Sequence, residues 1–137
     1  MAGLKKDELL ARLRPLVRAY QRLFVNRNDF YARQSPDGRY FLVRKPLTGW
    51  HFLHHFQGDF TLGLYAPSQA GTTRWACLDT DAEDGLKQLQ KAALTLREWD
   101  VAAHLEASRR GGHLWVFLEP VPVKIARTLL QEMARLA

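Results

Sequence analysis

The segment from Trp75 to Asp84, WACLDTDAED, is the feature that most constrains the fold of this chain. Its first half is nearly continuous in apolar residues, as in a strand that is buried on both faces of a sheet. Four acids then follow within six positions: Asp79, Asp81, Glu83 and Asp84. Packing alone gives a folded chain no reason to gather so much negative charge at the end of an apolar strand. These acids are therefore candidates for a chemical role.

Strand-like and helix-like patterns alternate along the rest of the chain. Apolar residues at three- and four-residue steps predict helices, and short apolar runs predict strands. The predicted helices cover 9–24, 47–58, 82–99 and 124–136, and the predicted strands cover 40–43, 60–66, 73–79, 102–108 and 113–120. This mixture in 137 residues predicts a single domain, 1–137, with a leading helical segment, 1–24. The expected fold class is α+β, a mixed or antiparallel sheet with flanking helices.

The same patterns predict details of the helices. Pro15 is expected to kink or split the first helix, because it removes one backbone donor. Thr48 is the expected N-cap of the second helix and Gly58 its stop. The side chains expected to face the core are Leu86, Leu89, Ala93 and Leu96 in the third helix and Ile125, Leu129, Met133 and Leu136 in the last.

Charge and cysteine content narrow the class of protein. Twenty Lys and Arg against fourteen Asp and Glu give a net charge of +6. This charge favours a polyanionic partner such as nucleic acid or, alternatively, reflects only a solvated basic surface. Cys77 is the only cysteine, which excludes an internal disulfide and a cysteine-based zinc site, and its apolar surroundings predict a buried side chain. No apolar segment has the length of a membrane span or of a signal core, so we expect a cytoplasmic protein.

Asp79 and Asp81 have the spacing of a metal site at a strand end. Side chains at positions i and i+2 of a strand point the same way, and two carboxylates so placed stay charged readily around a cation. Oxygen ligands suit Mg²⁺ or Mn²⁺, and such a pair is the usual core of nucleotidyl transfer. The alternative is structural: Asp81 caps a helix that begins at Ala82, and Glu83 and Asp84 complement the helix dipole. This alternative leaves Asp79 unexplained.

The segment 107–115, ASRRGGHLW, joins two predicted strands and can bind phosphate. Arginine forks match phosphate oxygens, and glycines let backbone amides approach an anion closely. The candidate phosphate ligands are Ser108, Arg109, Arg110 and His113. The alternative is an ordinary glycine hairpin with exposed arginines. If the two loops form one site, the acids bind cations and this loop binds the phosphates that the cations bridge.

The motif LDTD, followed beyond the next helix by LEASRRGGHLWVFLEPVP, resembles the archaeo-eukaryotic primase superfamily. The resemblance is greatest to the branch found in TOTE conflict systems and in CRISPR-associated primase-polymerases. The segments NRNDFYARQ, HFQGDFTLGLYA and ARTLL resemble that branch as well, so the resemblance runs from about Phe24 to the last residue. It implies the fold of the N-terminal part of a primase catalytic core.

The resemblance also implies an activity, template-directed synthesis of DNA or RNA with two divalent metals. Asp79 and Asp81 resemble the first two metal carboxylates and are the implied catalytic residues. Ser108 and His113 resemble the residues that contact the phosphates of the incoming nucleotide, with Arg109 and Arg110 in the same loop. The implied partners are nucleoside triphosphates and a DNA or RNA template, and no membrane.

A third metal carboxylate is implied on a later strand, so further domains or subunits are expected to supply it. Within the chain, Glu106 is the alternative. Three functions stay open: a primase-polymerase core, complete or partial; a non-catalytic module that binds nucleotide or nucleic acid; and a metal-dependent nuclease. The phosphate loop argues against the nuclease, because hydrolysis needs no triphosphate clamp.

Overall fold

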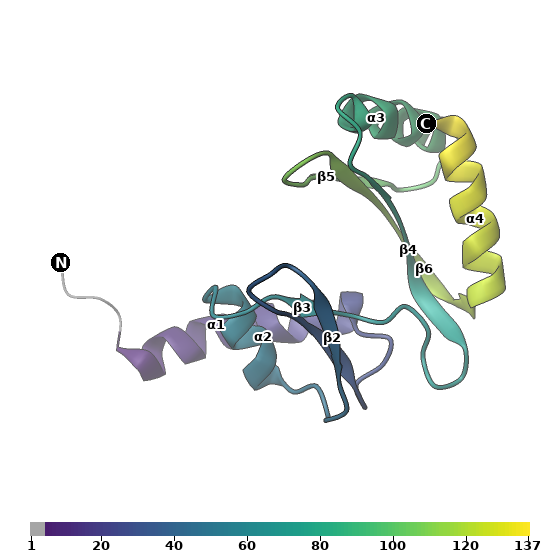
Figure 1. Ribbon diagram of the computed structural model, residues 1–137. Coiled ribbons are helices and arrows are strands. Elements are labelled where there is room, and N and C mark those ends of the chain that lie inside the picture. The colour runs from purple at the N-terminus through teal and green to yellow at the C-terminus, as the bar shows by residue number, and fades with distance from the viewer. Residues whose placement is uncertain (1–4) are drawn as a thin grey trace. The chain divides into compact units, whose positions relative to one another are not determined.

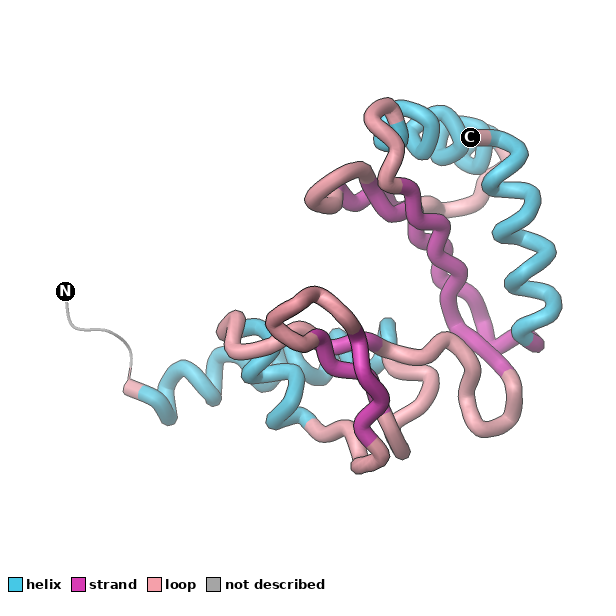
Figure 2. The backbone as a smooth tube through the Cα atoms, viewed as in Figure 1, coloured by secondary structure: helices cyan, strands magenta, loops and turns pink. Residues whose placement is uncertain are grey.

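The computed structural model describes residues 5–137, which form two compact units, one up to Gln69 and one from Ala70 to Ala137 (Figure 1). The element order is α1 (Lys6–Phe24), β1 (Tyr31–Gln34), β2 (Tyr40–Val43), α2 (Gly49–Phe56), β3 (Leu62–Gly63), β4 (Thr72–Thr80), α3 (Gly85–Glu98), β5 (His104–Ala107), β6 (Gly112–Pro122) and α4 (Val123–Leu136). The strands form two antiparallel sheets, β2–β1–β3 and β4–β6–β5 (Figure 2). The α+β class is therefore confirmed, and a single domain over 1–137 stays a prediction.

The first unit packs α1 and α2 on a small aromatic core. Val17, Tyr31, Leu47 and Phe52 are buried there, and Tyr20 contacts the core from α1. Pro15 does not split α1, which is continuous through it, because the ring removes only one hydrogen bond of the helical ladder.

The expected ends of α2 are confirmed. Thr48 is the N-cap, and its backbone N–H donates to Nδ1 of His51 at 3.0 Å. Gly58 follows the helix with a φ of +81°, a left-handed conformation that glycine adopts without strain. A turn at Ser35–Gly38, also closed by a left-handed glycine, connects β1 to β2.

The first sheet is short, and β2 forms one of its edges. β2 pairs with β1 along four residues, whereas β3 pairs only through Leu62 and Gly63. The strand predicted at 60–66 is thus shorter than expected, because β1 offers it few partners. On β2, Tyr40 is 55% exposed and Phe41 is 48% exposed.

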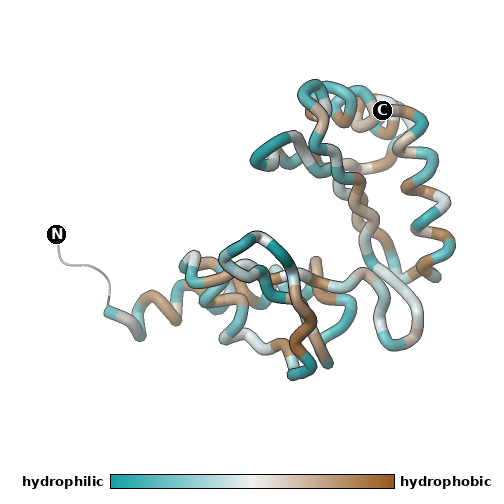
Figure 3. The backbone as a smooth tube through the Cα atoms, viewed as in Figure 1, coloured by the Kyte–Doolittle hydropathy of each residue, from teal (hydrophilic) through white to brown (hydrophobic). Residues whose placement is uncertain are grey.

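The second unit packs α3 and α4 on one face of the β4–β6–β5 sheet (Figure 1). Its core is aliphatic and is built from Leu89, Ala92, Leu96, Ala103, Leu114, Val116 and Met133. Along α4, hydrophilic and hydrophobic residues alternate as an amphipathic helix requires (Figure 3). Because strand side chains alternate between faces, Leu114 and Val116 enter this core while His113 and Trp115 lie on the opposite face.

Most of the side chains predicted to face the core do so: Leu89, Leu96 and Met133 are buried, and Ala93, Leu129 and Leu136 pack against this core. The prediction is wrong only at the first residue of each set. In α3, Leu86 is 38% exposed and Ala92 is fully buried. In α4, Ile125 is 57% exposed and Ala126 is buried. In each helix a small alanine packs at the centre of the contact, where its side chain allows close packing.

β6 continues through Pro120 and Pro122, where the prediction ends the strand at Pro120. Only β4 pairs with this part of β6, since β5 reaches no farther than Trp115. Proline is tolerated there because one side of the strand needs no backbone donor. Between residues 5 and 137 the structure holds no helix with the length and apolarity to cross a membrane.

Candidate functional site

The two aspartates lie where β4 ends. Asp79 is opposite His113 in the β4–β6 register, and its side chain is 60% exposed. Asp81 follows Thr80, the last residue of β4, and is also exposed. Neither carboxylate is buried against apolar groups. Within residues 5–137 no three or more His, Cys, Asp or Glu side chains form a ready metal cluster, so a cation site at the two aspartates stays a prediction.

The structural alternative for Asp81 is wrong. The helix α3 begins at Gly85 and not at Ala82, and Asp84 is its N-cap residue without a side-chain capping bond. The backbone N–H of Ala82 donates instead to Oγ1 of Thr80 at 3.3 Å. A Cβ on Gly85 would lie 2.5 Å from Cγ2 of Thr80, so the first residue of α3 packs closely on the last residue of β4. Helix capping therefore does not account for Asp81.

The β5–β6 loop lies directly against the end of β4. A Cβ on Gly111 would be 2.0 Å from the carbonyl oxygen of Thr80 and 3.3 Å from Cα of Asp81, so only glycine fits there. Ser108 closes the loop, because its Oγ accepts from the N–H of Gly111 at 3.1 Å and its own N–H donates to the Gly111 carbonyl at 3.1 Å. The structure thus brings the loop and the acids together, as the sequence predicts.

Arg109 and Arg110 form the exposed tip of this loop. Both guanidinium groups belong to the part of the loop that is open to solvent. Their position fits an anion-binding role and equally fits a solvated hairpin, so the predicted phosphate contacts of both residues stay predictions.

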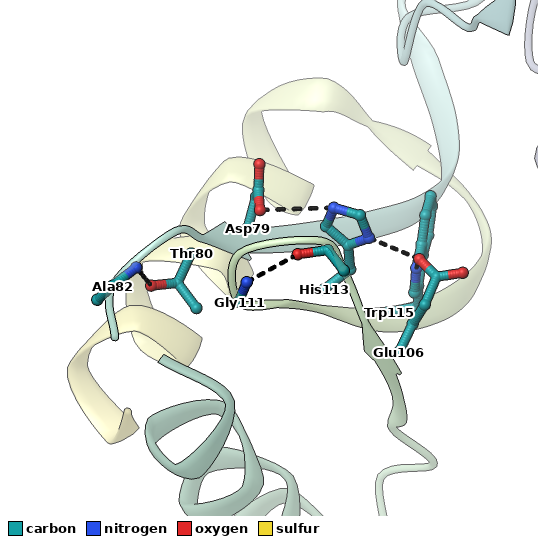
Figure 4. A network of polar contacts seen from close by, with 8 residues as sticks. Asp79, Thr80, Ala82, Glu106, Gly111, His113 and Trp115 are labelled. Atoms are coloured by element: carbon teal, nitrogen blue, oxygen red, sulfur yellow. Dashed lines mark hydrogen bonds and ion pairs between the residues drawn. The ribbon is translucent and has the colours of Figure 1, made fainter. Parts of the chain in front are cut away.

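His113 lies between two carboxylates (Figure 4). Its Nε2 is 3.5 Å from Oδ1 of Asp79, and its Nδ1 is 2.6 Å from Oε1 of Glu106. An ionised carboxylate only accepts hydrogen bonds, so Nδ1 carries a proton that it donates to Glu106. The same Oε1 accepts from Nε1 of Trp115 at 3.3 Å. Glu106 therefore fixes the orientation of the imidazole and directs Nε2 toward the strand end.

Sequence reasoning missed Glu106 as the partner of His113 and considered it only as a metal carboxylate. A signal was present, since a short hairpin loop at 108–111 sets Glu106 opposite His113 in the register. Cross-strand neighbours of this kind have side chains in direct contact.

Cys77 lies on β4 and is half-buried, somewhat less than expected. Burial, followed by the negative charges of Asp79 and Glu106, raises the pKa of the Cys77 thiol to about 12. The thiol is protonated at neutral pH, which excludes Cys77 as a nucleophile at this site.

Comparison with known families gives one match. A family described as "TOTE conflict system, Archaeo-Eukaryotic Primase domain" matches residues 40–137, which include α2 and the whole second unit. Every candidate site residue lies inside the matched range. Among curated proteins, none matches this chain.

Proposed function

Because the chain belongs to the archaeo-eukaryotic primase domain family of TOTE conflict systems, we propose that it binds a nucleoside triphosphate for nucleotidyl transfer. The proposed site comprises the end of β4 and the β5–β6 loop. The observation that carries the proposal is the packing of Gly111 against Thr80, which holds the loop of Ser108, Arg109 and Arg110 beside the end of β4, where the two aspartates lie.

The oxygen donors at the end of β4 fit a hard divalent cation. Asp79 and Asp81 would hold Mg²⁺ or Mn²⁺, because carboxylate oxygens are ligands that these ions prefer and both side chains are accessible to a cation. When bound, such an ion neutralises phosphate charge and lowers the pKa of an attacking hydroxyl. The chain itself supplies these two carboxylates at one strand end, next to a loop of cationic and hydroxyl side chains.

His113 and Ser108 are suited to hold the triphosphate. Glu106 holds Nδ1–H of His113, so Nε2 donates to a phosphate oxygen when the ring is charged, the form that suits an anionic ligand. The Ser108 oxygen already accepts from Gly111, which leaves its own O–H to donate. Arg109 and Arg110 add guanidinium forks that match phosphate oxygens in bidentate geometry.

The proposed reaction joins a nucleotide to a growing DNA or RNA strand on a template. The 3′-hydroxyl oxygen of the strand forms a bond to the α-phosphorus, and the bond from that phosphorus to the bridging oxygen breaks. Pyrophosphate leaves with the electron pair of that bond, and the hydroxyl proton passes to solvent. The donors of the 108–113 loop stabilise the charge that develops on the phosphates.

The first prediction tests the acids at this site. Asp79→Asn and Asp81→Asn should each weaken metal-dependent binding of a fluorescent nucleoside triphosphate about tenfold or more, because each removes a charged ligand. Asp84→Asn is the matched control, since it changes the same charge a few residues away, where the Asp84 carboxylate accepts hydrogen bonds from Gln88. Fluorescence anisotropy in Mg²⁺ and in Mn²⁺ measures the binding, and primer extension with deoxyribonucleotides or ribonucleotides measures transfer.

Equal effects of all three substitutions would contradict the proposed site. Nucleotide binding by the wild-type chain without any extension would support the alternative function, a non-catalytic nucleotide-binding module. Primer extension by the wild type, together with its loss in Asp79→Asn, would support nucleotidyl transfer.

A further inference from the structure

A groove between α1 and α2 in the first unit has no part in the proposed transfer site. Its volume is about 440 Å³, within the range of pockets that hold small molecules, and it lies along the middle of α1 and the start of α2. The matched family range begins at residue 40, so α1, which supplies more than half of the lining, lies outside the match.

The groove combines an apolar floor with a cationic rim. Val17 and Leu53 contribute apolar side chains, while Arg14 and Arg18 stand one helical turn apart on α1. None of the described residues that line the groove is acidic. Trp50 borders the groove with 57% of its surface exposed, so its indole ring is accessible to a ligand.

The exposed indole is held in place from behind. Its ring centroid is 4.0 Å from that of His54 and 6.1 Å from that of Phe60. Nδ1 of His54 is bound to Asp59 at 2.6 Å, and the guanidinium of Arg33 lies 4.3 Å above the ring of Phe60. This support presents a flat apolar surface beside positive charge, and a preorganised surface loses little entropy when a ligand binds.

We propose that this groove binds a single strand of nucleic acid, with one base stacked on Trp50 and neighbouring phosphates on Arg14 and Arg18. Stacking platforms interleaved with cations are the general means of binding single strands, because every base has an apolar face and every linkage has a charge. An acidic peptide would use the arginines but not the exposed indole. The groove does not depend on the transfer site, since it uses neither its metal ligands nor its phosphate loop.

The second prediction tests the groove in the full chain by anisotropy of labelled 15-mer oligothymidylate and oligouridylate, in EDTA and without nucleotide. These conditions remove metal and nucleotide from the transfer site, so the part of the binding that depends on Arg14 and Arg18 reports on the groove. Arg14→Ala/Arg18→Ala should weaken binding roughly tenfold and reduce the slope of log K against log salt by about 1.4, about 0.7 for each phosphate contact. Arg12→Ala/Arg22→Ala is the matched control, because these exposed arginines of α1 do not line the groove and should change binding less than about threefold.

Substitutions of Trp50 test the contribution of base stacking separately from that of charge. Trp50→Leu should weaken binding about tenfold with an unchanged salt slope, and Trp50→Phe should restore part of it, because a smaller ring still stacks. Circular dichroism should be the same for all variants, since the substituted side chains are exposed or border the groove. Equal losses from both arginine pairs, full affinity for an abasic 15-mer, or equal binding of polyglutamate would each overturn the proposal. A preference between the two oligonucleotides would identify DNA or RNA as the ligand.

Discussion

The two units of the chain solve the same packing problem with different side chains. The first unit fills its core with rings: Tyr20 lies 4.8 Å from Phe56 and 6.2 Å from Phe52, measured between ring centroids. The second unit has an aliphatic core under strands of nine and eleven residues. Aromatic side chains bury much area each, so they stabilise a unit whose strands are too short to bury enough apolar surface.

This difference has consequences for function. Long strands in continuous register fix the positions of side chains at their ends, as with Asp79 opposite His113 and Glu106 opposite His113. In the second unit, the candidate site is therefore an outcome of backbone pairing. In the first unit, the groove is an outcome of side-chain packing between the two helices α1 and α2.

The largest expected effect comes from truncating each core. Phe52→Ala should cost about 4 kcal/mol and Leu114→Ala about 3 kcal/mol of unfolding free energy, because both side chains are almost fully buried. Hydrogen exchange measured by mass spectrometry should increase in α1 and α2 for the first variant and in β4 and β6 for the second. Leu94→Ala is the control, since Leu94 is 56% exposed and should change stability by less than about 0.5 kcal/mol. Unchanged hydrogen exchange in the unit that carries the substitution would contradict the view that each unit has its own core.

A pair of glycines gives the next largest effect. Gly111→Ala should cost about 1–3 kcal/mol and disrupt nucleotide binding, because its Cβ would overlap the Thr80 carbonyl and move the loop. Gly49→Ala in the first unit should be neutral or stabilise by up to about 1 kcal/mol, because its Cβ meets Val17 at an ordinary 3.4 Å and alanine favours helix. For each variant, urea unfolding measures stability and fluorescence anisotropy measures nucleotide binding. Equal tolerance at the two positions would mean that the 108–111 loop is not held by β4.

The smallest effect is electrostatic and belongs to the first unit. Arg27 donates to the carboxylate of Asp29 at 2.6 Å and lowers the pKa of Asp29 from 3.8 to about 2. A lowered folded-state pKa adds stability above pH 4, and this stability is lost as the pH falls from about 4 through about 2. Urea midpoints for the wild type and Asp29→Asn should therefore differ at pH 6 and converge near pH 2. A difference that stays constant with pH would exclude this pair as its cause.

Local patterns predicted most of the elements because each needs only its own residues. The strand expected at 73–79 is found at Thr72–Thr80, and the helix expected at 124–136 is found at Val123–Leu136. The spacing of apolar residues identifies the first as a strand and the second as a helix. The prolines at 120 and 122 fix where the last helix begins. The proximity of the β5–β6 loop to the acids was predicted in the same way, from one hairpin beside one strand.

The features that were missed depend on contacts between elements. α3 begins at Gly85, which packs closely on Thr80, and no helix pattern in the sequence reveals this contact. Ala126 is buried where Ile125 was expected, because contact with the sheet, and not apolar spacing along α4, decides which residue faces the core. The bond from His113 to Glu106 required the strand register, which depends on the length of the loop rather than on either residue.

The exposed edge strand β2 affects how this protein behaves in concentrated solution. An edge strand with exposed apolar side chains such as Tyr40 and Phe41 is a template for pairing with a second molecule. Arg39, Arg44 and Lys45 flank it, and their like charges keep two copies apart. At about 1 M salt the screening length falls to about 3 Å, so the repulsion between two copies is largely lost. Strong salt should therefore weaken the protection of this edge and favour self-association of the protein.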